Sequence, residues 1–123
     1  MSESKSYELK ILPEAIDDIY DIELWYTLNF SKETGEKVRK SILNTIETLQ
    51  DFPNLGTTTP DEVLNSMGYR QILSRNHVII YAIQDFTIFI YHVANTRVDY
   101  PNVFKSSLGI DNILLNEDNY INY

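Results

Sequence analysis

Apolar residues between positions 13 and 50 recur at three- and four-residue intervals, a spacing that predicts two helices. The first is expected from Pro13 to about Asn29, because proline fits the first turn of a helix. The second is expected to begin after Ser31, whose hydroxyl can cap the first free N–H groups. Its buried stripe consists of Val38, Ile42, Ile46 and Leu49. Because so few residues separate the two helices, they are expected to form an antiparallel hairpin.

The second helix is expected to end in the segment from Asp51 to Gly56. Pro53 cannot continue a helix, and it biases Phe52 toward extended backbone angles. Gly56 is expected to complete the stop by adopting a positive φ. The segment is therefore interpreted as structural.

Beyond residue 65 the spacing of the apolar residues changes from one typical of helices to one typical of strands. Three runs rich in β-branched and aromatic residues, 68–74, 77–84 and 86–94, are separated by very short polar links and predict an antiparallel meander. The second and third runs are apolar on both faces, so they are placed centrally, with the helical hairpin covering one side. A further strand is expected at Tyr7 to Leu12. The order β-α-α-β-β-β, with the helices gathered on one face, makes the predicted fold class α+β.

The remaining segments are interpreted as connections and a tail. Residues 57–65, rich in Thr, Pro and acidic side chains, are expected to form an exposed connector. Residues 103–108 are expected to form a short helical turn. A single domain is assigned to residues 1–108. Residues 109–123, which mix apolar residues with Asn and acids, are interpreted as a loosely docked or partner-dependent tail.

Composition removes several classes of protein. The 123 residues include no cysteine, which excludes disulfide scaffolds, thiolate metal sites and cysteine nucleophiles, and only two histidines, which argues against a histidine-rich zinc site. The net charge of -8 argues against a surface that is a nucleic-acid footprint throughout, although a small cationic face stays compatible with it. No apolar run approaches the roughly 20 residues that cross a bilayer. A soluble cytoplasmic chain without a membrane partner is expected.

Four carboxylates share one face of the first predicted helix near its N-terminus, where the helix dipole favours negative charge. They are Glu14, Asp17, Asp18 and Asp21. Such a face is more often solvated than metal-bound, so no metal and no cofactor are expected. The same stripe is suited to receive a basic stretch of a partner.

Several local motifs, in this order and spacing, resemble the RelE/ParE family of toxins from type II toxin-antitoxin systems. The resemblance extends from about Tyr7 to Phe104. Its segments are Pro13-Glu-Ala-Ile-Asp-Asp-Ile, Thr48-Leu-Gln-Asp-Phe-Pro-Asn-Leu-Gly56, Gly68-Tyr-Arg70, Val78-Ile-Ile-Tyr81 and Val93-Ala-Asn-Thr-Arg-Val-Asp-Tyr100.

The resemblance implies a growth-inhibiting protein of the kind associated with plasmid stabilisation. Members of the family either cleave mRNA in the ribosomal A site or poison DNA gyrase. The implied partners are therefore the ribosome with mRNA or DNA gyrase, together with a cognate antitoxin that wraps the helical hairpin and the sheet edge. A homodimer and a toxin-antitoxin hetero-oligomer are both compatible with it.

RNA cleavage needs a group that activates the 2′-hydroxyl, a group that protonates the leaving oxygen, and cations for the phosphate. The candidate catalytic residues are Arg70, His92 and Arg97. The cleaving branch of the family has a basic residue just before the Val-x-x-Tyr motif and a His or Tyr near the end of the last strand. This sequence departs from both, since Val78 opens that motif and the last strand ends in Ala94-Asn95-Thr96.

Each cation and histidine also has a structural interpretation. Arg70 is expected to be either a sheet-surface ion pair or a functional cation. Strand alternation places His92 on the same face as Ile88 and Ile90, where a histidine is more often a core or rim residue than a catalyst.

The remaining candidates lie near turns. His77 begins a strand and is expected at a turn or on the surface, and Arg75 is expected to be a solvated hairpin residue. Arg97 is expected to pair with Asp99 and thereby pin the C-terminal segment.

Three hypotheses follow. The first is a toxin of the ParE-like, gyrase-directed mode, favoured by the acidic balance and the missing catalytic pair. The second is a metal-independent mRNA endoribonuclease that uses Arg70, Arg97 and His92. The third is a degenerate, non-toxic homologue that serves as a binding module, which predicts no growth arrest on expression.

Overall fold

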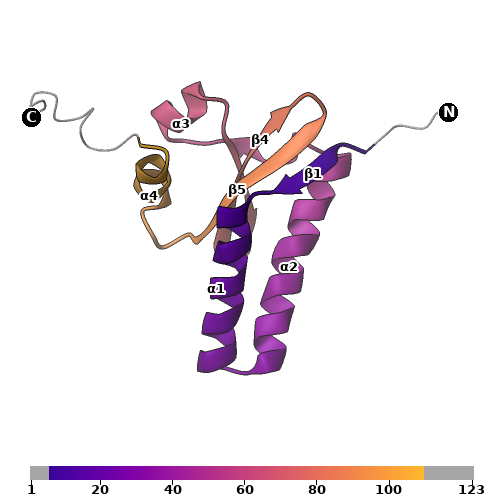
Figure 1. Ribbon diagram of the computed structural model, residues 1–123, viewed down its shortest axis with the longest axis vertical. Helices are drawn as coiled ribbons and strands as arrows, with labels where there is room; N and C mark the ends of the chain where they lie inside the picture. Colours follow the sequence, from indigo (N-terminus) through magenta and orange to yellow (C-terminus); the bar gives the residue numbers. More distant parts are fainter. Residues whose placement is uncertain (1–5, 110–123) are drawn as a thin grey trace, which may run out of the picture.

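The computed structural model describes residues 6–109, which fold into an α+β unit with one sheet (Figure 1). This confirms the predicted fold class. In chain order the elements are β1 (Glu8–Ile11), α1 (Pro13–Asn29), α2 (Lys32–Asp51), β2 (Thr57–Thr58), α3 (Glu62–Ser66), β3 (Arg70–Ser74), β4 (His77–Gln84), β5 (Thr87–Asn95) and α4 (Tyr100–Ser107).

The sheet has five strands in the order β1-β5-β4-β3-β2. Strands β3, β4 and β5 form the predicted antiparallel meander, and β4 and β5 lie inside the sheet as expected. The N-terminal strand β1 pairs parallel with β5, so the sheet is mixed. Among the helices of the described residues, none is long and apolar enough to cross a membrane.

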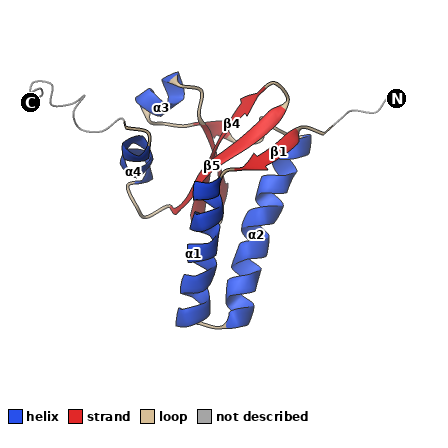
Figure 2. Ribbon diagram, viewed as in Figure 1, coloured by secondary structure: helices blue, strands red, loops and turns tan. Residues whose placement is uncertain are grey.

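Helices α1 and α2 run side by side and antiparallel, joined at the end remote from the sheet (Figure 2). Ser31 caps α2, since its Oγ accepts a hydrogen bond from the Thr34 N–H at 3.1 Å. Gly35 lets the helices approach, because a Cβ built at this position would lie 2.2 Å from Oγ1 of Thr27. The hairpin predicted from the sequence is therefore present, with a glycine where the two helices touch.

Each face of the sheet carries its own core. The hairpin face, as we call the side covered by α1 and α2, has the larger core, with buried residues Ala15, Ile19, Ile42, Ile46, Leu49, Ile79, Tyr81, Ile88, Ile90 and Val93. The opposite side, which we call the α4 face, has a smaller core of Leu64, Tyr69, Ile80 and Phe104.

Most of residues 57–65 are exposed, as the composition predicts, but the segment is more than a connector. It contains β2 and the start of α3, and Leu64 is fully buried in the core of the α4 face. Asp61 caps α3 by accepting a hydrogen bond from the Leu64 N–H at 3.0 Å. A helix of five residues is too short to produce a periodic apolar pattern, so the sequence did not reveal it.

The end of α2 also differs from the expectation. Among the described residues, Gly56 is not one of the positions with positive φ. Glycine is needed there for space, because a Cβ would lie 2.3 Å from the Gln71 carbonyl oxygen and 2.7 Å from the Tyr81 hydroxyl. The predicted helical turn near residues 103–108 is confirmed as α4. Most of the interpreted tail, residues 110–123, lies outside the described residues.

Candidate functional site

Arg70 holds the loop that follows α2. Its guanidinium donates to the carbonyl oxygens of Gly56 at 2.8 Å and Asn54 at 3.4 Å, and to the Tyr81 hydroxyl at 3.3 Å. The Tyr81 hydroxyl in turn donates to the Pro53 carbonyl at 2.8 Å. These contacts differ from the expected ion pair, because the partners of Arg70 are backbone carbonyls and a hydroxyl. Its alternative role as a functional cation stays a prediction.

An irregularity in β5 moves His92 to the face opposite the one expected. The register shifts between Ile80 and Tyr81, so that Ile80 pairs with His92 and Tyr81 pairs with Ile90. A β-bulge adds one residue to a strand and reverses the alternation beyond it. His92 therefore lies on the α4 face, where its ring stacks on Phe104 with centroids 5.7 Å apart. The placement beside Ile88 was wrong for this reason.

Asp18 links His92 to α1. Its carboxylate contacts Nδ1 of His92 and accepts a hydrogen bond from the Val93 N–H at 2.9 Å. Strand β1 pairs with β5 only as far as Ile90, so a carboxylate from α1 takes over where the strand partner ends. Asp18 is therefore not one of the solvated carboxylates expected on this face of the helix. In the described part of the chain, no group of three or more acidic or histidine side chains is placed to hold a metal.

The α4 face is closed by an ion pair as well as by its apolar core. Lys105 of α4 lies 2.9 Å from the carboxylate of Asp61, the cap of α3. Burial raises the pKa of Asp61, but the hydrogen bond from the Leu64 N–H and the Lys105 charge outweigh it, so the pKa lies below its usual value. The ion pair between Asp61 and Lys105 therefore connects α3 to α4 on this face.

The three predicted catalytic residues do not converge. Arg70 pairs with Tyr81 and shares the hairpin face, whereas His92 pairs with Ile80 on the α4 face. Arg97 follows β5 and lines a pocket to which neither of the other two belongs. One phosphate could not contact side chains on both faces of a sheet, so the trio does not form a single site. Their catalytic role stays a prediction.

The expected pair between Arg97 and Asp99 is not formed. No ion pair between them occurs among residues 6–109, and the Asp99 carboxylate instead accepts a hydrogen bond from the side-chain amide of Asn102 at 2.8 Å. The backbone N–H of Arg97 donates to the side chain of Asn95 at 2.8 Å, which closes the turn after β5. The Arg97 side chain is thereby left beside α1.

His77 is buried, with 4% of its surface exposed, which corrects its assignment to a turn or the surface. It begins β4 on the hairpin face, and its ring lies edge-on to Tyr26 with centroids 6.0 Å apart. Burial lowers the pKa of His77 from its usual value. The sequence misleads here because a residue that follows a two-residue turn is usually exposed, whereas α1 covers this one.

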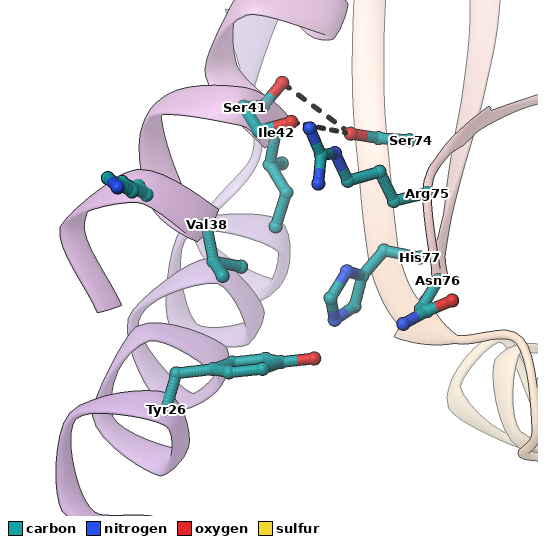
Figure 3. Close-up of a pocket in the computed structure, with 9 residues that line it drawn as sticks. Tyr26, Val38, Ser41, Ile42, Ser74, Arg75, Asn76 and His77 are labelled. Atoms are coloured by element: carbon teal, nitrogen blue, oxygen red, sulfur yellow. Dashed lines mark hydrogen bonds between the residues drawn. The ribbon is translucent and has the colours of Figure 1, made fainter. Parts of the chain in front are cut away.

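Two adjoining pockets meet at His77, between the hairpin and the turn that joins β3 to β4, and Figure 3 shows the smaller of them. Their volumes are about 260 and 530 Å³, and both are lined by Tyr26, Asn76 and His77. We call them together the His77 groove. The smaller pocket is further lined by Lys37, Arg75, Val38, Ser41, Ile42 and Ser74. The larger one is further lined by Arg97, Trp25, Phe30, Asp21, Ile22 and Asn95. Sequence reasoning missed the groove because residues far apart in the chain form it.

Comparison with known proteins defines the family. The family model described as the ParE toxin of type II toxin-antitoxin systems, parDE, matches residues 9–100, most of the chain. The chain belongs to this ParE toxin family. Among curated protein sequences, none is significantly similar to it.

Solved structures share the fold of this ParE-family chain. A chain of the chromosomal ParDE toxin-antitoxin system from P. aeruginosa has 24% identity and a TM-score of 0.64, with 75% of this chain and 98% of that chain covered. A chain of the toxin-antitoxin complex RelBE2 from Mycobacterium tuberculosis has 13% identity and a TM-score of 0.56, with 77% and 97% covered. The expected membership of the RelE/ParE toxins is thereby confirmed.

The ParE-family chain exposes an apolar stripe on α1. The stripe consists of Ile16, Tyr20, Leu24 and Leu28, which are 53%, 63%, 42% and 75% exposed. These positions are spaced four residues apart and therefore follow one side of the helix. Helix α1 consequently has apolar side chains on two sides, one packed on α2 and the sheet and the other open.

Proposed function

We propose that this chain is a growth-inhibiting toxin that acts on DNA gyrase and is neutralised by a cognate antitoxin. Membership of the ParE toxin family supports a toxin. The similarity to chains of the ParDE and RelBE2 toxin-antitoxin systems supports an antitoxin as partner. The gyrase-directed mode is the one that the ParE branch of the family implies.

The observation that carries this choice of target is the separation of the candidate catalytic side chains. Arg70 holds a loop on the hairpin face, and His92 is paired with Asp18 on the other face. General acid-base cleavage needs an acid, a base and a cation within hydrogen-bonding reach of one phosphate. A toxin that inhibits by binding to its target needs no such convergence.

The antitoxin is expected to cover the apolar stripe of α1. A row of four large apolar side chains spaced four residues apart fits the apolar face of a partner helix. The exposed carboxylates of Glu14, Asp17 and Asp21 lie on the same helix. They favour a partner segment that is basic where it passes the N-terminal half of α1.

A gyrase assay tests the target. The purified chain is added to gyrase with relaxed plasmid and ATP, and in parallel to a translation reaction with labelled mRNA. We expect accumulation of relaxed or cleaved DNA with gyrase and intact mRNA on the ribosome. Cleaved mRNA together with normal supercoiling would contradict the proposal, and induced expression without growth arrest would favour the non-toxic binding homologue.

One observation favours the endoribonuclease as a second candidate. An imidazole held by a carboxylate is an arrangement that general bases use, and His92 with Asp18 has it beside a pocket of about 260 Å³ lined by Glu14 and Phe104. If this pair were catalytic, His92→Gln would abolish mRNA cleavage while leaving antitoxin binding intact. We expect the same variant to keep full activity against gyrase.

A further inference from the structure

The cations of the His77 groove form no ion pair with the acidic side chains that the structure describes. Lys37, Arg75 and Arg97 line the groove, and no ion pair of any of them occurs within residues 6–109. Arg39, two residues after Lys37 in α2, is by contrast paired with Glu23 at 3.2 Å. The pocket that Lys37 and Arg75 line has no acidic lining residue, and Asp21 is the single carboxylate that lines the other pocket, beside Arg97. The groove is therefore a local positive region in a chain with a net charge of -8.

His77 adds a buried polar group that points into the same cavity. Figure 3 shows its ring directed into the space between β4 and the hairpin, toward Tyr26. His77 is only 4% exposed, yet no hydrogen bond to its ring occurs among the described residues. Buried polar side chains are nearly always hydrogen-bonded to protein or to water, so this ring is available to a donor or acceptor that enters the groove.

The backbone at Arg75 supports a role for its side chain. Arg75 has a φ of 56°, in the left-handed region that glycine and asparagine adopt more easily. A two-residue β-hairpin turn therefore gains nothing in stability from arginine at this place. In Figure 3 the Arg75 side chain extends from the turn across the groove toward α2. Strain held at a residue that lines a cavity is typical of binding positions.

The other end of the groove offers apolar contact. Trp25 and Phe30 are 54% and 66% exposed and lie with their ring centroids 6.0 Å apart. Leu28, the last residue of the apolar stripe, lies between them in the sequence, near the end of α1. A segment that follows the stripe along α1 can therefore continue into the groove.

We propose that the His77 groove binds an acidic segment of the antitoxin, with a carboxylate seated between Lys37 and Arg75 and an apolar side chain against Trp25. This inference rests on the proposed function, because it assigns part of the same partner to a defined place. A carboxylate fits better than a phosphate, because Asp21 lines the groove and the net charge of -8 opposes a doubly charged group more strongly. The partner is then basic along the start of α1 and acidic at its end.

A binding titration tests the proposal. The probe is the cognate antitoxin, and the signal is the fluorescence of Trp25, the single tryptophan of the sequence, with a Trp25→Phe variant as the blank. Wild-type binding is measured first. Lys37→Glu and Arg75→Glu are each expected to weaken binding by about tenfold or more and to reduce its dependence on salt.

Controls separate the groove from general charge and from folding. Lys40→Glu changes an exposed lysine of α2 that does not line the groove, and it is expected to leave affinity within about twofold. Arg75→Asn keeps a residue that accepts the left-handed backbone, so it tests the loss of charge in a chain that folds. Replacing the antitoxin residue whose carboxylate is proposed to lie between Lys37 and Arg75 by lysine is expected to restore binding to Arg75→Glu.

The outcomes distinguish the two claims. If the wild-type chain does not bind the antitoxin, the proposed function fails and this inference fails with it. If the wild type binds and Lys37→Glu, Arg75→Glu and Arg75→Asn bind equally well, only this inference is overturned. Displacement of the antitoxin by millimolar ATP or inorganic phosphate would also overturn it, because the groove would then be a phosphate site.

Discussion

The two histidines of this chain lie on opposite faces of the same sheet and in opposite electrostatic settings. His92, on the α4 face, has a carboxylate at its Nδ1 and an aromatic ring stacked on it. His77, on the hairpin face, is more deeply buried and opens onto a groove whose cations have no acidic partners among the described residues. His92, the histidine nearest to the position expected for a family catalyst, is therefore the one that already has partners within the chain. His77, by contrast, faces the groove, which a partner can fill.

The largest effect is expected from breaking the contacts of His92. Asp18→Ala removes the acceptor of the Val93 N–H and the partner of His92 together, which leaves partly buried donors unsatisfied. We expect a loss of about 2 kcal/mol in the free energy of unfolding, measured by urea denaturation. Asp17→Ala, at an exposed position of the same helix, is the matched control and is expected to stay within about 0.5 kcal/mol. Equal stability of the two variants would mean that the contact is incidental.

The second effect is a dependence of stability on pH that belongs to His77. Burial lowers its pKa, so between pH 6.5 and the folded-state value the unfolded chain binds a proton that the folded chain does not. Stability is therefore expected to fall as the pH decreases below 6.5, with a slope of at most about 1.4 kcal/mol per pH unit. This dependence is measured by comparing the denaturation midpoints of the wild type and His77→Asn between pH 5 and 8, the range in which histidine titrates.

Asp61 contributes to stability in a different pH range from His77. The lowered pKa of Asp61 also stabilises the fold, but that contribution is lost only as the pH falls below the usual value of 3.8. A slope near pH 6 that persists unchanged in His77→Asn would therefore contradict the assignment, since Asp61 does not titrate there.

The smallest effect is a gain in stability. Arg75→Gly relieves the left-handed backbone at the turn between β3 and β4, so we expect about 0.5 to 1 kcal/mol of stabilisation in thermal unfolding. The same substitution removes a cation of the groove and is expected to weaken antitoxin binding. A variant that is more stable and binds equally well would argue that Arg75 is only a turn residue.

Local signals in the sequence predicted the helices well. The bounds of α1 match the prediction because Pro13 marks its start, and Ser31 marks the start of α2 for a similar reason. The central position of β4 and β5 followed from their apolar character on both faces. Such features are encoded within a few residues of one another.

The site was not predictable in the same way. A single extra residue in β5 moves His92 to the other face, and nothing in the strand's composition marks the bulge. The His77 groove combines Tyr26 and Lys37 of the hairpin with a turn some forty residues later, so its cations are scattered in the sequence. Only the packing of α1 and α2 against the sheet brings them together.

Hydrogen exchange of this chain with and without its antitoxin tests the contrast between the two faces most directly. We predict slower amide exchange in residues 74–77 and in the part of α1 around Trp25 when the antitoxin is bound. Exchange in α4 around Phe104 is predicted to stay unchanged, since that face is already covered. Protection concentrated in α4 and around His92, with the His77 groove unaffected, would contradict the account.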